Sequence, residues 1–186
     1  MANKNPRIGF RPNADAKGQI NTRTIAISAS NTVPLFPGSL YYVSAGKALG
    51  LTAAYADDGD IAGTIVRLYN DDGCTVQNCL ASVSGFNAEV TFEEKQEYVS
   101  TFDDASFADD GTDNGKFYNC TDEAATGNAN GLDGDPYSQR TLEGASEAAS
   151  AKQFAVSRKT GTPGNEGGVA GTEVYCTINP ANWQSW

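Results

Sequence analysis

The 186-residue sequence contains no histidine, a single methionine and two tryptophans. Without histidine the chain lacks the commonest general base, proton shuttle and metal ligand, which excludes Ser-His-Asp, Cys-His and His-based zinc chemistry. Long apolar runs are also missing, since no window approaches the ~20 apolar residues that a membrane-spanning helix needs. The N-terminus has charged residues where a signal peptide has its apolar run. We therefore expect no membrane partner and synthesis in the cytosol.

Cysteine is scarce, with four residues at positions 74, 79, 120 and 176. In a cytosolic protein such thiols stay reduced and behave as small buried apolar side chains. A bridge between Cys74 and Cys79 and an all-cysteine zinc site remain open, although the paired two-residue knuckles of zinc sites are missing. We expect no metal and no cofactor.

The formal charge of −10 is unevenly distributed. Residues 1–23 carry five basic side chains and one acidic one, whereas the rest of the chain carries eight basic and twenty-two acidic ones. An acidic body repels nucleic acid, because phosphate binding needs a basic face. We therefore expect no nucleic-acid partner.

Acidic residues are the remaining source of catalytic or ion-binding chemistry. A glycosidase uses two carboxylates, but no spacing singles out a pair among Glu93, Glu94, Asp103 and Asp104. The turn that starts at Asp110 resembles a calcium loop until its twelfth position, where Thr121 replaces the bidentate glutamate. A solvated acidic surface is the simpler interpretation, and we expect the protein not to be an enzyme.

Apolar residues recur with a period near two, which is typical of β-strands. Glu173, Tyr175 and Thr177, for example, alternate with the more apolar Val174, Cys176 and Ile178. The predicted strands are 24–29, 39–44, 63–69, 88–92, 98–102, 153–158 and 174–178, with a weaker one at 116–120. Turn dipeptides such as Pro37-Gly38 and Asn114-Gly115 separate them. The sequence predicts an all-β fold, a single β-sandwich or small β-barrel.

Three segments depart from this pattern. Residues 1–22 contain helix-breaking prolines and glycines and predict an extended basic arm, which neighbouring subunits would order, ahead of an acidic body at 23–186. Residues 103–136 are rich in Asp, Gly and Asn and predict a long surface excursion that contacts a neighbour. Residues 141–152 predict the one short helix.

Several short motifs, in chain order, carry a resemblance. These are Gly-Phe-Arg-Pro at 9–12, Phe-Pro-Gly-Ser-Leu at 36–40, Ala-Gly-Thr-Ile-Val at 62–66, Asp-Asp-Gly at 71–73, Gln-Phe-Ala-Val at 153–156 and the terminal strand with its Ile-Asn ending at 173–179. Together they resemble small virion structural proteins of tailed bacteriophages, of the type that decorates and stabilises the capsid. The four cysteines and the acidic excursion depart from that pattern.

The resemblance implies a non-enzymatic protein, made in the bacterial cytoplasm, that binds the major capsid protein on the outer surface of the virion, often as a trimer. Such a subunit gains affinity by combining many weak contacts. The predicted capsid-binding residues of the arm are Arg7, Phe10, Arg11 and Pro12. Trp183 and Trp186 are candidate aromatic anchors between subunits, or they pack against their own domain.

Two other functions remain open. A phage tail or head-fibre component shares the Gly, Asn and Thr content of this chain. A glycan-binding β-sandwich would stack sugars on Trp183 and Trp186, or on the adjacent Tyr41 and Tyr42.

Overall fold

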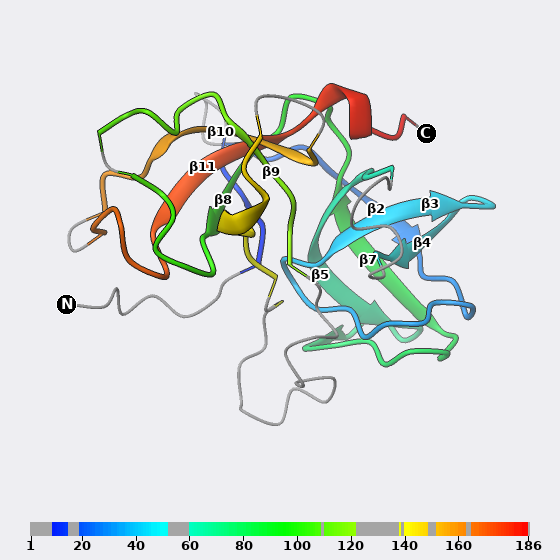
Figure 1. Cartoon of the computed structure of the whole chain (residues 1–186). Helices are drawn as coiled ribbons and strands as arrows, with labels where there is room; N and C mark the ends of the chain where they lie inside the picture. The colour runs from blue at the N-terminus through cyan, green and yellow to red at the C-terminus, as the bar shows by residue number, and fades with distance from the viewer. Residues whose placement is uncertain are drawn as a thin grey trace.

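The computed structural model describes residues 9–14, 19–51, 60–108, 110–121, 138, 140–148, 152–162 and 165–185. Figure 1 shows two antiparallel sheets, one on each side of the view, which confirms the predicted all-β, sandwich-like fold. Within these ranges, no helix has the length and apolar character needed to cross a membrane.

The five-stranded sheet joins segments from both ends of the chain. Its order is β1-β8-β11-β10-β9. The strands are β1 (Arg11–Pro12), β8 (Glu97–Thr101), β11 (Glu173–Ile178), β10 (Phe154–Lys159) and β9 (Phe117–Tyr118). A central long pair, β10 and β11, is therefore flanked by strands from distant parts of the sequence.

The six-stranded sheet comes from a continuous part of the chain, in the order β2-β7-β5-β3-β4, with β6 paired to β5. The strands are β2 (Thr22–Ala26), β3 (Leu40–Ser44), β4 (Lys47–Gly50), β5 (Gly63–Asn70), β6 (Thr75–Val76) and β7 (Phe86–Thr91). Ile27 bridges to Ala48, and the Ser28 N–H donates to the Ala48 carbonyl at 2.9 Å. The sheet thus curls until its two edges meet.

Each sheet carries its own hydrophobic core. The first cluster lies on the five-stranded sheet and includes Phe10, Tyr98, Phe102 and Phe154. The second lies inside the curled sheet and is mostly aliphatic, with Ile25, Leu35, Ile65, Leu68 and Val90 among its members.

A buried chain of hydroxyl groups joins the two cores at Thr91, the last residue of β7. The Thr91 Oγ1 lies 3.0 Å from the Tyr98 Oη and accepts the Thr64 N–H at 3.0 Å. The Thr91 carbonyl accepts the Tyr41 hydroxyl at 2.7 Å. Gly63 has a φ of 151°, and a Cβ there would collide with the Thr91 carbonyl oxygen. Glycine is needed because two backbones meet at this point.

All eight predicted strands are present in the structure, with ends that differ by a few residues. The short strands β1, β4 and β6 were not predicted. The helix predicted at 141–152 is wrong, because residues 141–148, the described part of that range before residue 152, form only the single 3-10 turn η3 (Gly144–Ser146). Leu142 is fully buried, and Ala148 bridges to Phe117 of β9. Tertiary contacts on both sides of η3 hold this stretch extended.

The surface excursion predicted at 103–136 is only partly outside the domain. Phe107 and Tyr118 are buried in the first core, and β9 lies within the predicted range. Asp113 is also buried and accepts the Lys116 ammonium at 2.8 Å. The part of the prediction at 122–136 lies outside the described residues.

The C-terminal segment closes the open side of β3. After η4 (Pro180–Asn182), the Gln184 side-chain amide accepts the Val43 N–H at 2.6 Å and donates to the Val43 carbonyl at 3.0 Å. The Ile61 N–H donates to the Asn182 carbonyl at 2.7 Å. Trp183 bridges to Ile61 and packs against the first core of its own domain.

Candidate interaction face

Phe10 is not a surface residue, and its predicted role as a capsid contact is wrong. Its side chain is fully buried, and its ring stacks on that of Phe154 with centroids 4.3 Å apart. Gly9 precedes it with a φ of 63°, and a Cβ there would lie 2.7 Å from the Cβ of Ser138. The Phe10 N–H donates to the Gly38 carbonyl at 3.0 Å. The Gly-Phe pair is thus an internal anchor, and burial of the ring offsets part of the entropy cost of ordering residues 9–14.

The expectation that neighbouring subunits order the leader is also wrong for residues 9–14. Arg11 and Pro12 form β1, which pairs with Val99 and Tyr98 of β8. The Asn13 N–H donates to the Glu97 carbonyl at 2.8 Å. Arg7 lies outside the described residues, and its role stays a prediction.

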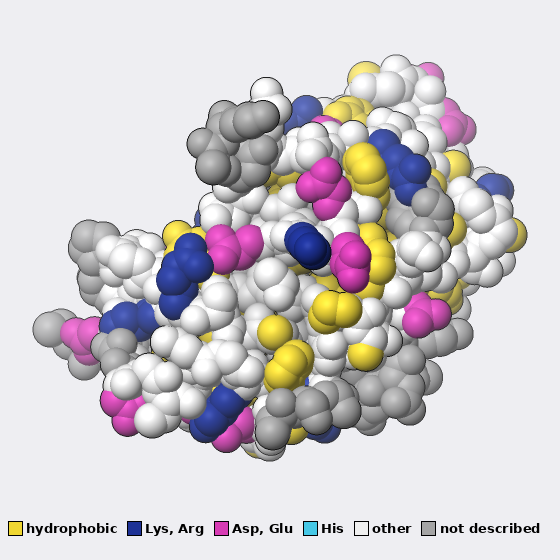
Figure 2. Space-filling view, turned by 90° about the horizontal axis from the view of Figure 1, so that it is seen from above, with side chains coloured by type: hydrophobic (Ala, Val, Ile, Leu, Met, Phe, Trp, Pro, Cys, Tyr) yellow, Lys and Arg dark blue, Asp and Glu magenta, His cyan; other side chains and the backbone are white. Residues whose placement is uncertain are grey.

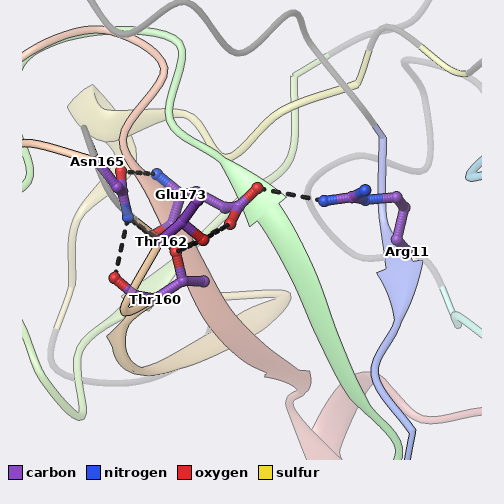
Figure 3. A network of polar contacts seen from close by, with 5 residues as sticks. All are labelled: Arg11, Thr160, Thr162, Asn165 and Glu173. Atoms are coloured by element: carbon purple, nitrogen blue, oxygen red, sulfur yellow. Dashed lines mark hydrogen bonds and ion pairs between the residues drawn. The ribbon is translucent and has the colours of Figure 1, made fainter.

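Arg11 also ties β1 to a polar cluster around Glu173 (Figure 3). The Glu173 Oε2 accepts the Arg11 guanidinium at 3.2 Å, while its Oε1 accepts the hydroxyls of Thr160 at 2.9 Å and Thr162 at 3.0 Å. Asn165 accepts the Glu173 N–H at 2.8 Å and donates to the Glu173 carbonyl at 2.7 Å. A carboxylate that is almost fully buried therefore has partners for both oxygens, as burial of a charge requires.

Strand register places two rows of side chains on the outer face of the five-stranded sheet, opposite the buried Val174, Cys176 and Ile178 of β11. One row is Arg11, Val99, Tyr175 and Arg158, and the other is Glu97, Thr177, Ala155 and Phe117. We call these eight residues the outer sheet face. Every one of them keeps some solvent exposure.

Arg158 reaches this face because of a β-bulge. The register of β10 against β11 shifts between Val156 and Arg158, so Arg158 lies opposite Tyr175 and not on the buried side with Val156. Its guanidinium lies 4.2 Å from the centroid of the Tyr175 ring and pairs with Glu97 at 3.0 Å. A bulge re-aims a side chain in this way without breaking the sheet.

Figure 2 looks down on the side of the molecule that carries β10 and β11 in Figure 1. Hydrophobic side chains there lie between basic and acidic ones, and neither charge forms one large patch. Tyrosine and arginine are enriched among the residues that dominate binding energy at protein interfaces. This composition suits protein recognition.

Of the aromatic residues predicted as anchors or sugar-stacking sites, none that the structure describes belongs to the outer sheet face. Tyr41 is fully buried, so it is wrong as a sugar-stacking residue, while Tyr42 keeps partial exposure. Trp183 packs against its own core, as one of the two interpretations expected. Trp186 lies outside the described residues.

The candidate catalytic acids have structural partners. Asp103 accepts the Gly144 N–H at 3.0 Å, Asp104 accepts the Ser106 N–H at 2.9 Å, and Glu93 accepts the Asn21 amide at 2.6 Å. Asp110 accepts both the N–H and the hydroxyl of Thr112, which lowers the pKa of its carboxyl group. Over the described ranges, no group of three acids or cysteines is placed to hold a metal ion.

All four cysteines are free, with Cys74 exposed and the other three buried. The bridge between Cys74 and Cys79 that the sequence left open is not formed.

Sequence reasoning missed Arg158 and Phe117 as surface residues of one face. The alternation in 173–178 did place Tyr175 opposite Cys176, but the bulge that brings Arg158 beside it has no local sequence signal. No family model, curated protein or solved structure matches this chain.

Proposed function

We propose that the protein is a structural subunit of a tailed-phage particle that binds the outer surface of the capsid through its outer sheet face. The observation that carries the proposal is the pairing of the exposed Arg158 with the partly exposed Tyr175 on the outer sheet face. The in-order resemblance of residues 9–12, 36–40, 62–66 and 173–179 to capsid decoration proteins supports the same assignment.

The face is suited to docking because its side chains are already ordered. Arg158 is held by Glu97 and Tyr175, and Arg11 is held by Glu173. Less side-chain entropy is lost on binding when such residues are fixed beforehand. The two arginines lie at opposite ends of one row of four side chains and would meet acidic groups of the capsid, as charge complementarity requires.

Stabilisation would follow from mass action. A subunit that binds only the assembled shell at 100 times its dissociation constant contributes ~2.7 kcal/mol per independent site. Assembly as a trimer would add avidity, because one bound subunit raises the effective concentration of the next contact. Many sites on one shell would then resist the internal pressure of packaged DNA.

The test is co-sedimentation of the purified chain with expanded, DNA-free capsids of the phage that encodes it. We expect Arg158→Ala and Tyr175→Ala each to weaken capsid binding by at least tenfold, which equals ~1.4 kcal/mol. The matched control is Arg67→Ala on the other sheet. The side chains of Arg67 and Arg158 are each 55% exposed, and each pairs with a glutamate.

Equal weakening by Arg67→Ala and Arg158→Ala would contradict a specific outer sheet face. Absence of capsid binding by the unaltered chain would contradict the function itself. Labelled chain found on tails or head fibres of the intact virion would favour the alternative of a tail or fibre component.

A further inference from the structure

The outer surface of the six-stranded sheet contains a shallow depression of about 280 Å³. It lies on the side opposite the buried Leu68 and Ala88, where the register aligns Ala26, Asn87, Tyr69 and Thr75. Its lining comes from β2, β5, β7 and the turn after β5, with residues Thr24, Tyr69, Asn70, Asp71, Gly73 and Asn87. None of these residues belongs to the outer sheet face.

The aromatic ring in this depression has a fixed position. The Tyr69 hydroxyl donates to the Glu89 Oε2 at 3.1 Å and accepts the Arg67 guanidinium at 3.4 Å. Glu89 is held in turn by the Thr22 hydroxyl at 2.7 Å. Since Tyr69 lies opposite Asn87 in the register, a bond to Glu89 two residues away draws the ring along the sheet surface. The ring therefore borders the depression as an ordered apolar surface.

Three polar side chains of the lining make no hydrogen bond to any residue that the structure describes. They are the Asp71 carboxylate, the Asn87 amide and the Thr24 hydroxyl, whereas the neighbouring Asn70 accepts the Cys74 N–H at 2.8 Å and holds the turn. Asp71 lies over Gly85, where a Cβ would come within 2.7 Å of its Oδ2. A larger residue at position 85 would displace the carboxylate, so the glycine leaves the space that Asp71 occupies.

These groups match the chemistry of a sugar. A carboxylate supplies acceptors only, an amide supplies both donors and acceptors, and a hydroxyl does both. The hydroxyl groups of a saccharide also donate and accept, and its C–H face packs on an aromatic ring. Asp71 and Glu89 disfavour an anion, and the nearby cation Arg67 is paired with Glu89 at 3.8 Å.

We propose that this depression binds a neutral saccharide, with the sugar ring against Tyr69, its hydroxyls donating to Asp71 and hydrogen-bonded to Asn87 and Thr24. The site is independent of capsid docking, because it lies on the other sheet. A virion protein with such a site would attach to neutral glycans while its outer sheet face stays bound to the shell.

The experiment is saturation-transfer NMR and calorimetry of the full chain with glucose, galactose, mannose, N-acetylglucosamine and their β- and α-linked disaccharides. We expect saturable binding of at least one of these sugars at millimolar concentration, as fits a shallow site with one aromatic contact. Asn87→Ala and Asp71→Ala should each weaken that binding by about tenfold, because each removes a hydrogen-bonding partner. Tyr69→Phe, which keeps the ring, should weaken it less than Tyr69→Ala.

The control is Tyr175→Ala, which removes a partly exposed tyrosine from the other sheet and should leave sugar binding unchanged. Circular dichroism of each variant establishes that it is folded. The proposal is overturned if no sugar of the panel binds, or if a bound sugar is insensitive to both Asn87→Ala and Asp71→Ala. Because capsid binding is measured with Arg158→Ala, either proposal can fail while the other stands.

Discussion

The two cores of this molecule are built from different side chains. The first contains six buried aromatic residues, namely Phe10, Tyr98, Phe102, Phe107, Tyr118 and Phe154. Among the described residues of the second, Tyr41 is the one fully buried aromatic residue, and the others are aliphatic apart from Cys79. Large planar rings fill space between irregular segments, whereas small branched side chains suit the interior of a tightly curled sheet.

The cores also differ in how far apart their members lie in the sequence. The fully buried members of the second core lie between residues 25 and 90, and those of the first lie between residues 10 and 178. Closing long loops costs conformational entropy before the contacts are gained. The contact of Phe10 with Phe154 joins residues 144 positions apart, so closing it costs more chain entropy than a contact within the second core.

The largest effect that separates the cores is expected from Phe10→Ala. This change removes a fully buried ring together with its stacking on Phe154. It should lower the free energy of unfolding by about 3–5 kcal/mol. Urea denaturation measures it. The control is Phe86→Ala, which truncates a partly exposed ring against the second core and should cost about 1–2 kcal/mol. An equal or smaller loss in Phe10→Ala would mean that the leader is not an anchor.

Phe10 illustrates where sequence reasoning ends. The prolines and glycines of residues 1–22 correctly predict an irregular, non-helical leader, but they do not specify which surface the ring covers. The stacking partner, Phe154, lies 144 residues away, and a terminal aromatic residue suits a foreign surface as well as its own core. Alternation in the sequence did predict eight of the strands, because half-buried strands require it.

The site was harder to predict than the fold for a related reason. Two bulges, one between Val156 and Arg158 and one between Ile65 and Arg67, each bring an arginine to an outer surface. A bulge changes which face a residue occupies, so a strict period of two assigns Arg158 to the wrong side. Local sequence carries no sign of either shift.

The second largest effect on the free energy of unfolding is expected at the seam between the cores, by which we mean the buried hydrogen bonds around Thr91. Thr91→Val keeps the shape of the side chain but removes the hydrogen bonds to Tyr98 and to the Thr64 N–H, leaving buried polar groups without a partner. We expect a loss of about 1–3 kcal/mol in the free energy of unfolding. Thr101→Val is the matched control, because the buried Thr101 hydroxyl has no hydrogen-bond partner among the residues that the structure describes. That variant should be neutral or slightly more stable, and the opposite ranking would show that the seam is unimportant.

A smaller loss of stability should appear at alkaline pH, and it comes from one buried cysteine in each core. Burial raises the pKa of the Cys79 thiol in the second core to about 11, and burial raises the pKa of the Cys176 thiol in the first core further still. Above the ordinary thiol pKa of 9.0, the unfolded chain loses these protons while the folded chain keeps them. Stability is therefore complete below pH 9 and falls as the pH rises, by at most ~1.4 kcal/mol per pH unit for each thiol.

Urea denaturation at several values between pH 8 and pH 10.5 measures this slope. Cys79→Ala and Cys176→Ala should each flatten it, whatever they do to stability at pH 8. Cys74→Ala is the control, because the exposed Cys74 is outside both cores. A slope that none of the buried cysteines affects would mean that the thiols do not limit alkaline stability.

The smallest effect on the free energy of unfolding is expected from Arg11→Ala, although Arg11 directly follows Phe10, whose replacement should have the largest effect. The Arg11 side chain is 50% exposed, and its ion pair with Glu173 at 3.2 Å is open to solvent on one side. Ion pairs of this kind contribute about 0–1 kcal/mol. Glu173 keeps the Thr160 and Thr162 hydroxyls as partners when the guanidinium is removed.

Urea denaturation should therefore find the free energy of unfolding of Arg11→Ala within 1 kcal/mol of that of the unaltered chain, and this difference should shrink further in salt. A loss close to that of Phe10→Ala would show that charge, and not burial of the ring, holds the leader on the sheet. Phe10 and Arg11 are adjacent, but the Phe10 ring is buried while the Arg11 side chain is half exposed. Comparing the two alanine variants therefore separates the burial that holds the leader in place from the charge that stays on the surface for a partner.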